Sequence, residues 1–449
     1  MAASVRWWLR RQRRLLLSEA RWRQQAVFWG GGALIGLVAV GFAAVADLAY
    51  GWLRLIIAWS PYVMLLVSPA GFALLAYLTG RYFQGAQGSG IPQTIAAREI
   101  DSPWARRALL SLRVAAGKVV MTTLALLFGA SVGREGPTVQ VGASIMHELG
   151  RLGGRHYDGL ILAGGAAALA AAFNTPIAGI VFAVEELSRS FEQRNSRLVF
   201  SSVILAGLVS LGLVGDYTYF GTFAGHPFGG SIWLAVLLCG VVGGLLGGVF
   251  GRIVILLAFA ERQPLLAPIV RHKVPFAAGC GLLVALIGLV TGGDTYGTGY
   301  EQARGLLEGT SHADPWFGLA KLGTTLLSTV SGIPGGIFSP SLAAGAGIGH
   351  GLSWLLPHVA VGAVVLLGMA GYFTGVVQAP ITAVVIIVEM TGATSMTLPL
   401  MATAILALAA SRLVSPDALY HTLSDRYLPR PKDRDAGAQR SAADGSKIT

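Results

Sequence analysis

The run from Leu322 to Val388 contains no Asp, Glu, Lys or Arg. One crossing of a bilayer as a helix needs about 20 predominantly apolar residues, so this run is long enough for about three crossings. Charged residues make up 12% of the chain, whereas soluble domains contain about 25%. The run therefore indicates a protein that crosses a membrane several times.

Several other windows are apolar over the length of a membrane span. The apolar residues in them do not alternate with polar ones, as the strands of a membrane β-barrel would require. Val119–Gly133 is shorter than an upright span, and glycines interrupt the longest run. Both features predict tilted and re-entrant helices enclosed by protein. We expect an all-α polytopic membrane protein with spans within Gln24–Ala46, Leu55–Gly80, Gly159–Val184, Val274–Gly293 and Thr391–Ser411.

The two ends of the chain are polar or basic. Seven arginines precede the first apolar window, a density typical of the cytoplasmic side of a membrane. We expect residues 1–26 to form a basic amphipathic helix on the cytoplasmic face; a disordered basic arm is the alternative. A signal peptide would have a short apolar core and a small-residue cleavage site instead. The polar tail, residues 429–449, is expected to be disordered, with both termini cytoplasmic.

Composition also bears on ligands and partners. The net charge of +11 gathers near the termini and in residues 106–118, as membrane topology requires, so we expect no nucleic-acid partner. Cys239 and Cys280 lie in apolar stretches and predict no disulfide framework. The sequence contains no Cys/His cluster with metal-ligand spacing and no GxxxxGK[ST] phosphate loop. We expect no metal site and no cofactor, and transport driven by gradients or by a partner's energy.

The sequence repeats itself weakly but in order. The repeat predicts two related membrane halves, residues 27–215 and 231–428, joined by a linker at 216–230. Gly/Pro-interrupted repeats are typical of transporters with a binding site near the midplane of the membrane. The sequence alone leaves parallel and inverted repeats open. The matched stretches are Gly88–Gly90 with Gly297–Gly299, 133–143 with 335–346, and 171–186 with 375–390, the last pairing Glu185 with Glu389.

Three motifs place glycines just before a proline: GSGIP (88–92), GREGP (133–137) and GGIFSP (335–340). Glycine allows close backbone approach, and proline suits the first turn of a helix. Helix N-termini expose unpaired N–H groups and a partial positive charge, so converging N-termini bind an anion without a lysine or arginine. Such a site also releases its ion. The alternative is that these residues serve only helix packing.

These motifs, followed by Tyr420, resemble the CLC family of chloride channels and proton-coupled chloride transporters, in its bacterial form without soluble regulatory domains. The resemblance extends from about residue 27 to Tyr420. It implies an inverted repeat of many tilted helices and one anion path per subunit of a homodimer, which we expect in the bacterial inner membrane. It also implies that chloride binds the hydroxyls of Ser89 and Tyr420 and the backbone N–H groups of Ile337 and Phe338.

The residues alone also allow other roles for two of these positions. Ser89 has the spacing of a helix N-cap, and Tyr420 could be an interfacial tyrosine. Within the family, serine at position 89 is informative, since fluoride-selective relatives carry Asn there and nitrate-selective plant relatives carry Pro. Gln93 departs from the family, because many relatives carry an acid at this position.

Glu135 lies between two glycines in apolar surroundings, where a carboxylate is costly. The resemblance makes it the gating glutamate and the external proton-transfer residue. When ionised it would occupy the anion path, and when protonated it would swing away. Burial favours the neutral carboxyl and helix dipoles favour the ionised form, so the charge state can change.

The resemblance makes Glu186 the internal proton-transfer residue, which favours a chloride/proton antiporter over the alternative, a passive voltage- or pH-gated chloride channel. We expect Glu185 to be the solvated end of a helix and Glu389 to be structural. His147 and His156 are expected in loops or at helix ends. A membrane enzyme using the glutamates as general acids is disfavoured, because no nucleophile, metal set or cofactor motif accompanies them. We therefore expect no enzymatic activity.

Overall fold

The computed structural model describes residues 19–152, 159–187, 196–215, 218–223, 231–264, 267–311 and 314–428. Regular structure within these ranges is helical, apart from two isolated β-bridges. Most of the expected amphipathic arm and of the linker, the whole tail 429–449, and His156 lie outside the described residues.

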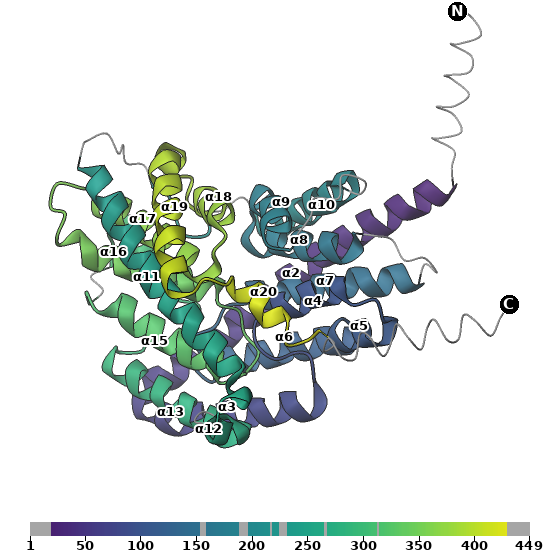
Figure 1. Ribbon diagram of the computed structural model, residues 1–449, viewed down its shortest axis with the longest axis horizontal. Helices are drawn as coiled ribbons and strands as arrows, with labels where there is room; N and C mark the ends of the chain where they lie inside the picture. The colour runs from purple at the N-terminus through teal and green to yellow at the C-terminus, as the bar shows by residue number, and fades with distance from the viewer. Residues whose placement is uncertain are drawn as a thin grey trace, which may run out of the picture.

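Most helices of the first predicted half lie on one side of the molecule and most of the second half on the other, with α20 between them (Figure 1). The exception is α3 of the first half, which packs against α13 of the second. The first half contains α2 (Glu19–Trp59), η1 (Pro61–Val63), α3 (Met64–Tyr82), α4 (Ile91–Glu99), α5 (Pro103–Leu109), α6 (Leu112–Leu127), α7 (Glu135–Leu152), α8 (Leu160–Phe173), α9 (Pro176–Glu185) and α10 (Ser196–Val214). The second contains α11 (Ile232–Ala258), η2 (Ala260–Arg262), α12 (Ala267–Arg271), α13 (Lys273–Val290), α14 (Tyr300–Glu308), α15 (Phe317–Val330), α16 (Phe338–Ser353), α17 (Val361–Val377), α18 (Pro380–Thr391), η3 (Thr394–Met396), α19 (Thr397–Val414) and α20 (Leu419–Ser424).

Seven helical segments in the described part of the chain are long and apolar enough to cross a membrane. Shorter apolar helices, α8, α9, α17 and α18, lie among them. α8 and α17 are almost wholly buried, as expected for helices enclosed by protein. The prediction of an all-α polytopic membrane protein is confirmed.

Three expected apolar segments have different boundaries in the structure. The window Leu55–Gly80 crosses a break at Ser60, because α2 ends at Trp59 and a proline opens the next turn. The window Gly159–Val184 is two helices, α8 and α9, separated by Asn174 in the left-handed conformation (φ 57°). The run Val119–Gly133 contains only the second part of α6, which begins before it at Leu112, includes the buried Lys118 and ends at Leu127.

Glycines let several pairs of helices cross with their backbones in direct contact. A Cβ on Gly142 of α7 would clash with the Gly164 carbonyl of α8. In the second half, a Cβ on Gly243 of α11 would reach the backbone of α17 at Gly371, 2.6 Å away. Small residues at such crossings are typical of membrane helices, where close packing replaces the hydrophobic driving force.

Two glutamates tie the predicted halves together in a reciprocal way. Glu389 of α18 accepts hydrogen bonds from the N–H groups of Ile177 (3.1 Å) and Ala178 (2.6 Å) at the start of α9. Glu185 of α9 accepts from Ile381 (3.1 Å) and Thr382 (2.6 Å) at the start of α18. Each carboxylate satisfies N–H groups that a helix start leaves unpaired. Glu185 is therefore a cap of α18, and its expected role as a merely solvated helix end is wrong.

Candidate functional site

The three glycine-proline motifs meet at the centre of the molecule. The Gly133 and Gly336 backbones exchange two hydrogen bonds of 2.7 and 2.8 Å. Gly88 accepts from the N–H of Gly335 at 3.0 Å and donates to Ile333 at 3.2 Å. These short bridges hold the starts of α4, α7 and α16 close together, as the converging-helix interpretation predicts.

Glycine is required at this junction for steric reasons. A Cβ on Gly336 would lie 2.9 Å from Pro137 Cδ and 3.0 Å from the Gly136 nitrogen. A Cβ on Gly136 would collide with the Ser89 hydroxyl. The motifs therefore let three backbone segments approach one another, beyond any general packing role.

The four residues expected to bind chloride lie beside this junction. Ser89, Ile337 and Tyr420 line one cavity, and the Phe338 ring lies 6.1 Å from the Tyr420 ring, centre to centre. The Ser89 and Tyr420 hydroxyls face each other but form no hydrogen bond of normal geometry. Ile337 is the N-cap residue of α16 and Phe338 its first residue, so their N–H groups belong to a helix start.

The alternative roles of Ser89 and Tyr420 do not fit their surroundings. The residue before α4 is Gly90, with a φ of 100° and no side-chain cap, so Ser89 does not cap this helix. Tyr420 is 1% exposed, which is too buried for an interfacial tyrosine. Buried hydroxyls are normally hydrogen-bonded, but these two have no hydrogen-bond partner.

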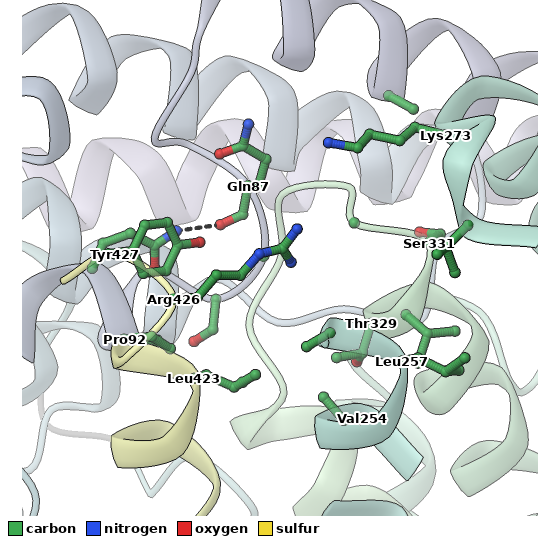
Figure 2. A pocket seen from close by; sticks show the side chains of 18 of the residues that line it. Gln87, Pro92, Val254, Leu257, Lys273, Thr329, Ser331, Leu423, Arg426 and Tyr427 are labelled. Atoms are coloured by element: carbon green, nitrogen blue, oxygen red, sulfur yellow. Dashed lines mark hydrogen bonds between the residues drawn. The ribbon is translucent and has the colours of Figure 1, made fainter. Parts of the chain in front are cut away.

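The cavity at Ser89 and Tyr420 has a volume of about 470 Å³ and opens toward one end of the helices, where α3 ends and α13 begins. Figure 2 shows Lys273 and Arg426 extending their basic ends into this space from separate elements. Glu261, 3.9 Å from Arg426, is also at the wall. We call this space the inner cavity.

A second cavity, of about 460 Å³, lies toward the opposite end, where α2 ends. Its wall includes Arg134, which is paired with Asp47 of α2 at 3.1 Å. Arg54 and Glu301 form another pair at 2.8 Å, and Tyr219 completes the wall near Arg134. We call this space the outer cavity.

Glu135, the first residue of α7, lines neither cavity and is fully buried. Its neighbour Arg134 lines the outer cavity, and the Ser89 hydroxyl of the inner cavity lies close to Gly136. The Glu135 Oε2 atom has no hydrogen-bond partner, so half of the carboxylate is unsatisfied. The residue thus lies in the protein layer between the two cavities.

Ser339 is a residue of this site for which the sequence analysis gave no role. Its hydroxyl donates to Glu135 Oε1 at 2.5 Å, and the serine is fully buried. The signal was present in GGIFSP, as a serine at the second position of a predicted helix.

Glu186 is the C-cap residue of α9, at the end of that helix. It is 3% exposed, and its Oε1 atom has no hydrogen-bond partner. Tyr420 lies within electrostatic range of both Glu186 and Glu135. His147, by contrast, lies on α7 away from these groups and is half-buried.

Two buried lysines donate hydrogen bonds to the carbonyls of loops near the junction. Lys118 donates to the carbonyls of Gln87 (3.2 Å) and Gly88 (2.8 Å). Lys321, in the other predicted half, donates to the carbonyls of Thr295 (2.9 Å) and Gly297 (2.7 Å). Each lysine fixes the loop that contains one of the matched Gly-X-Gly motifs.

Comparisons with known proteins agree with this architecture. The structure resembles that of a slow cyanobacterial Cl⁻/H⁺ antiporter, with a TM-score of 0.77 and 24% identity over 91% of this chain and 99% of the other. A CLC-type fluoride/proton antiporter gives 0.73 and 24% over 89% and 96%. A eukaryotic CLC transporter gives 0.72 and 22% over 90% and 74%.

These likenesses establish the fold, and the sequence establishes the family. The profile described as "Voltage gated chloride channel" matches residues 70–412, most of the chain. The match includes the three glycine-proline motifs and Glu135. On this evidence the chain belongs to the voltage-gated chloride channel family, the CLC family of chloride channels and transporters.

Proposed function

We propose that this protein is a chloride/proton antiporter in which Glu135 is both the gate and the external proton-transfer residue. The observation that carries the proposal is the position of Glu135, a fully buried glutamate between two cavities at the start of α7. An ionised carboxylate there competes with an anion for the same helix ends. Protonation removes its charge and releases it from them, so opening the path and taking up a proton occur together.

Chloride itself is proposed to bind between the Ser89 and Tyr420 hydroxyls and the N–H groups of Ile337 and Phe338. The support is that these groups meet at the end of the inner cavity and that both hydroxyls lack a hydrogen-bond partner. Hydroxyl and N–H donors neutralise an anion only partly, which permits its release.

Glu186 is proposed as the internal proton-transfer residue. Burying a carboxyl with an unsatisfied oxygen costs free energy of folding. A role in proton transfer accounts for a buried glutamate at this position. The position of Tyr420 within electrostatic range of both glutamates supports a proton route that runs past the chloride site.

We further propose that the protein is a homodimer in a bacterial inner membrane, with both termini cytoplasmic and the chain folded as two repeats, residues 27–215 and 231–428. The basic arm supports the orientation, and the reciprocal caps of Glu185 and Glu389 support the repeats. Exposed apolar side chains on α9 and α18, among them Ile177 (59%) and Ile381 (61%), are available to a second copy.

A flux assay on the purified protein in liposomes tests the proposed activity. With a chloride gradient and an internal pH probe, an antiporter drives protons against their own gradient. Chloride flux without uphill proton movement would identify a passive channel, and absence of both fluxes would reject transport of chloride.

A further inference from the structure

We propose that Ser339 is a positioning residue that holds the ionised Glu135 carboxylate in the closed gate. The inference rests on the proposed gating role of Glu135. It adds one side chain that sets how easily the gate opens.

The geometry of Ser339 supports this role. The Oγ–Oε1 distance of 2.5 Å is short, as expected for a hydroxyl that donates to a charged carboxylate. Both residues are fully buried, so water does not replace this bond while the gate is closed. Ser339 lies in the first turn of α16, so the hydroxyl adds a movable donor to a helix start that already attracts negative charge.

Other charged and titratable groups around Glu135 are few in the described part of the chain. Arg134 precedes it and is paired with Asp47 on α2. Tyr420 on α20 and Tyr219 lie within electrostatic range of it. Lys118 on α6 and Lys321 on α15 direct their amines at loop carbonyls. Within these residues, Ser339 is the side chain that donates directly to the Glu135 carboxylate.

Removing the Ser339 hydroxyl has a defined effect on pH dependence. The bond stabilises the ionised carboxylate over the neutral one, so its loss lets the neutral, open gate persist to higher pH. Chloride flux, which rises as the gate protonates, should therefore show its midpoint shifted upward. The free energy of a hydrogen bond to a charged group corresponds to a shift of about one pH unit in this midpoint.

The test is chloride efflux from liposomes as a function of pH, with Ser339→Ala, Ser339→Cys and Ser339→Thr. We expect the midpoint to shift upward by about one pH unit for Ser339→Ala. The shift should be smaller for Ser339→Cys, whose thiol is a weaker donor, and the midpoint should stay close to that of the parent protein for Ser339→Thr, which keeps the hydroxyl. Ser341→Ala is the matched control: this serine lies on the same helix, is fully buried and has no hydrogen-bond partner. It should leave the midpoint unchanged.

An unchanged midpoint in well-folded Ser339→Ala would overturn the proposal, as would equal shifts in Ser339→Ala and Ser341→Ala. If Ser339→Ala does not fold, an unchanged midpoint in Ser339→Cys is sufficient to reject the proposal. Glu135→Gln separates this failure from failure of the proposed function. If chloride flux through Glu135→Gln is independent of pH and the midpoint of Ser339→Ala is unchanged, only the role of Ser339 is rejected. If chloride flux through Glu135→Gln still depends on pH, the gating role of Glu135 is rejected.

Discussion

At the scale of single residues, we predict that the Ser89 hydroxyl sets the anion preference. Ser89 lies at the inner cavity with its oxygen unbonded, so its donor is available to a weakly hydrated anion such as chloride. Ser89→Pro removes this donor, and we expect nitrate flux to rise several-fold relative to chloride flux. Efflux of both anions from liposomes measures this ratio.

Ser89→Ala is the control for that experiment, since it removes the hydroxyl without adding the proline ring. It should weaken chloride preference without producing the full nitrate preference. An anion ratio unchanged in both variants would show that Ser89 does not line the path.

The internal proton route is also predicted to depend on a single side chain, that of Glu186. Glu186→Gln keeps the size of the side chain but removes its proton, so chloride flux should persist while coupled proton movement falls by about tenfold or more. Glu185→Gln is the matched control, because Glu185 is adjacent but bonds to the start of α18. Full coupling in Glu186→Gln would assign the internal proton role to another residue.

At the scale of helices, the reciprocal caps between α9 and α18 are predicted to contribute to stability. Glu389→Ala leaves two N–H groups at the start of α9 without their partner, which should cost about 1 kcal/mol. We expect a lower melting temperature in detergent, and a similar loss for Glu185→Ala. Glu308→Ala, which breaks an i,i+4 surface pair, should have little effect. Equal melting temperatures for all three variants would contradict the capping role.

Helix boundaries show where sequence patterns were insufficient. Hydropathy identified the apolar segments but not the break after Phe173, because the left-handed Asn174 leaves no trace in an average over a window. The apolar run begins only after Lys118, so the sequence placed the start of this segment later than the start of α6. The helix includes Lys118 because its amine donates to carbonyls of a loop distant in the sequence. Both errors arise from tertiary contacts, which local patterns do not contain.

At the scale of the whole molecule, the convergence of the three glycine-proline motifs could be predicted because glycine and proline act through the backbone. The repeated order of the motifs indicated that they share one site, and the structure brings them together. The hydrogen bond from Ser339 to Glu135 could not be predicted. It joins the starts of two helices that are 204 residues apart in the sequence, and a local pattern does not contain that contact.

The central claim is that one buried carboxyl between the two cavities serves as gate and proton carrier. Glu135→Gln tests it most directly, because glutamine is nearly isosteric with the protonated glutamate and mimics the open gate at every pH. The decisive measurement is chloride and proton flux of this variant in liposomes, with size-exclusion chromatography to establish folding. We predict that chloride flux persists without pH dependence and that the chloride reversal potential no longer responds to a proton gradient. A well-folded variant that still moves protons against their gradient would contradict the account.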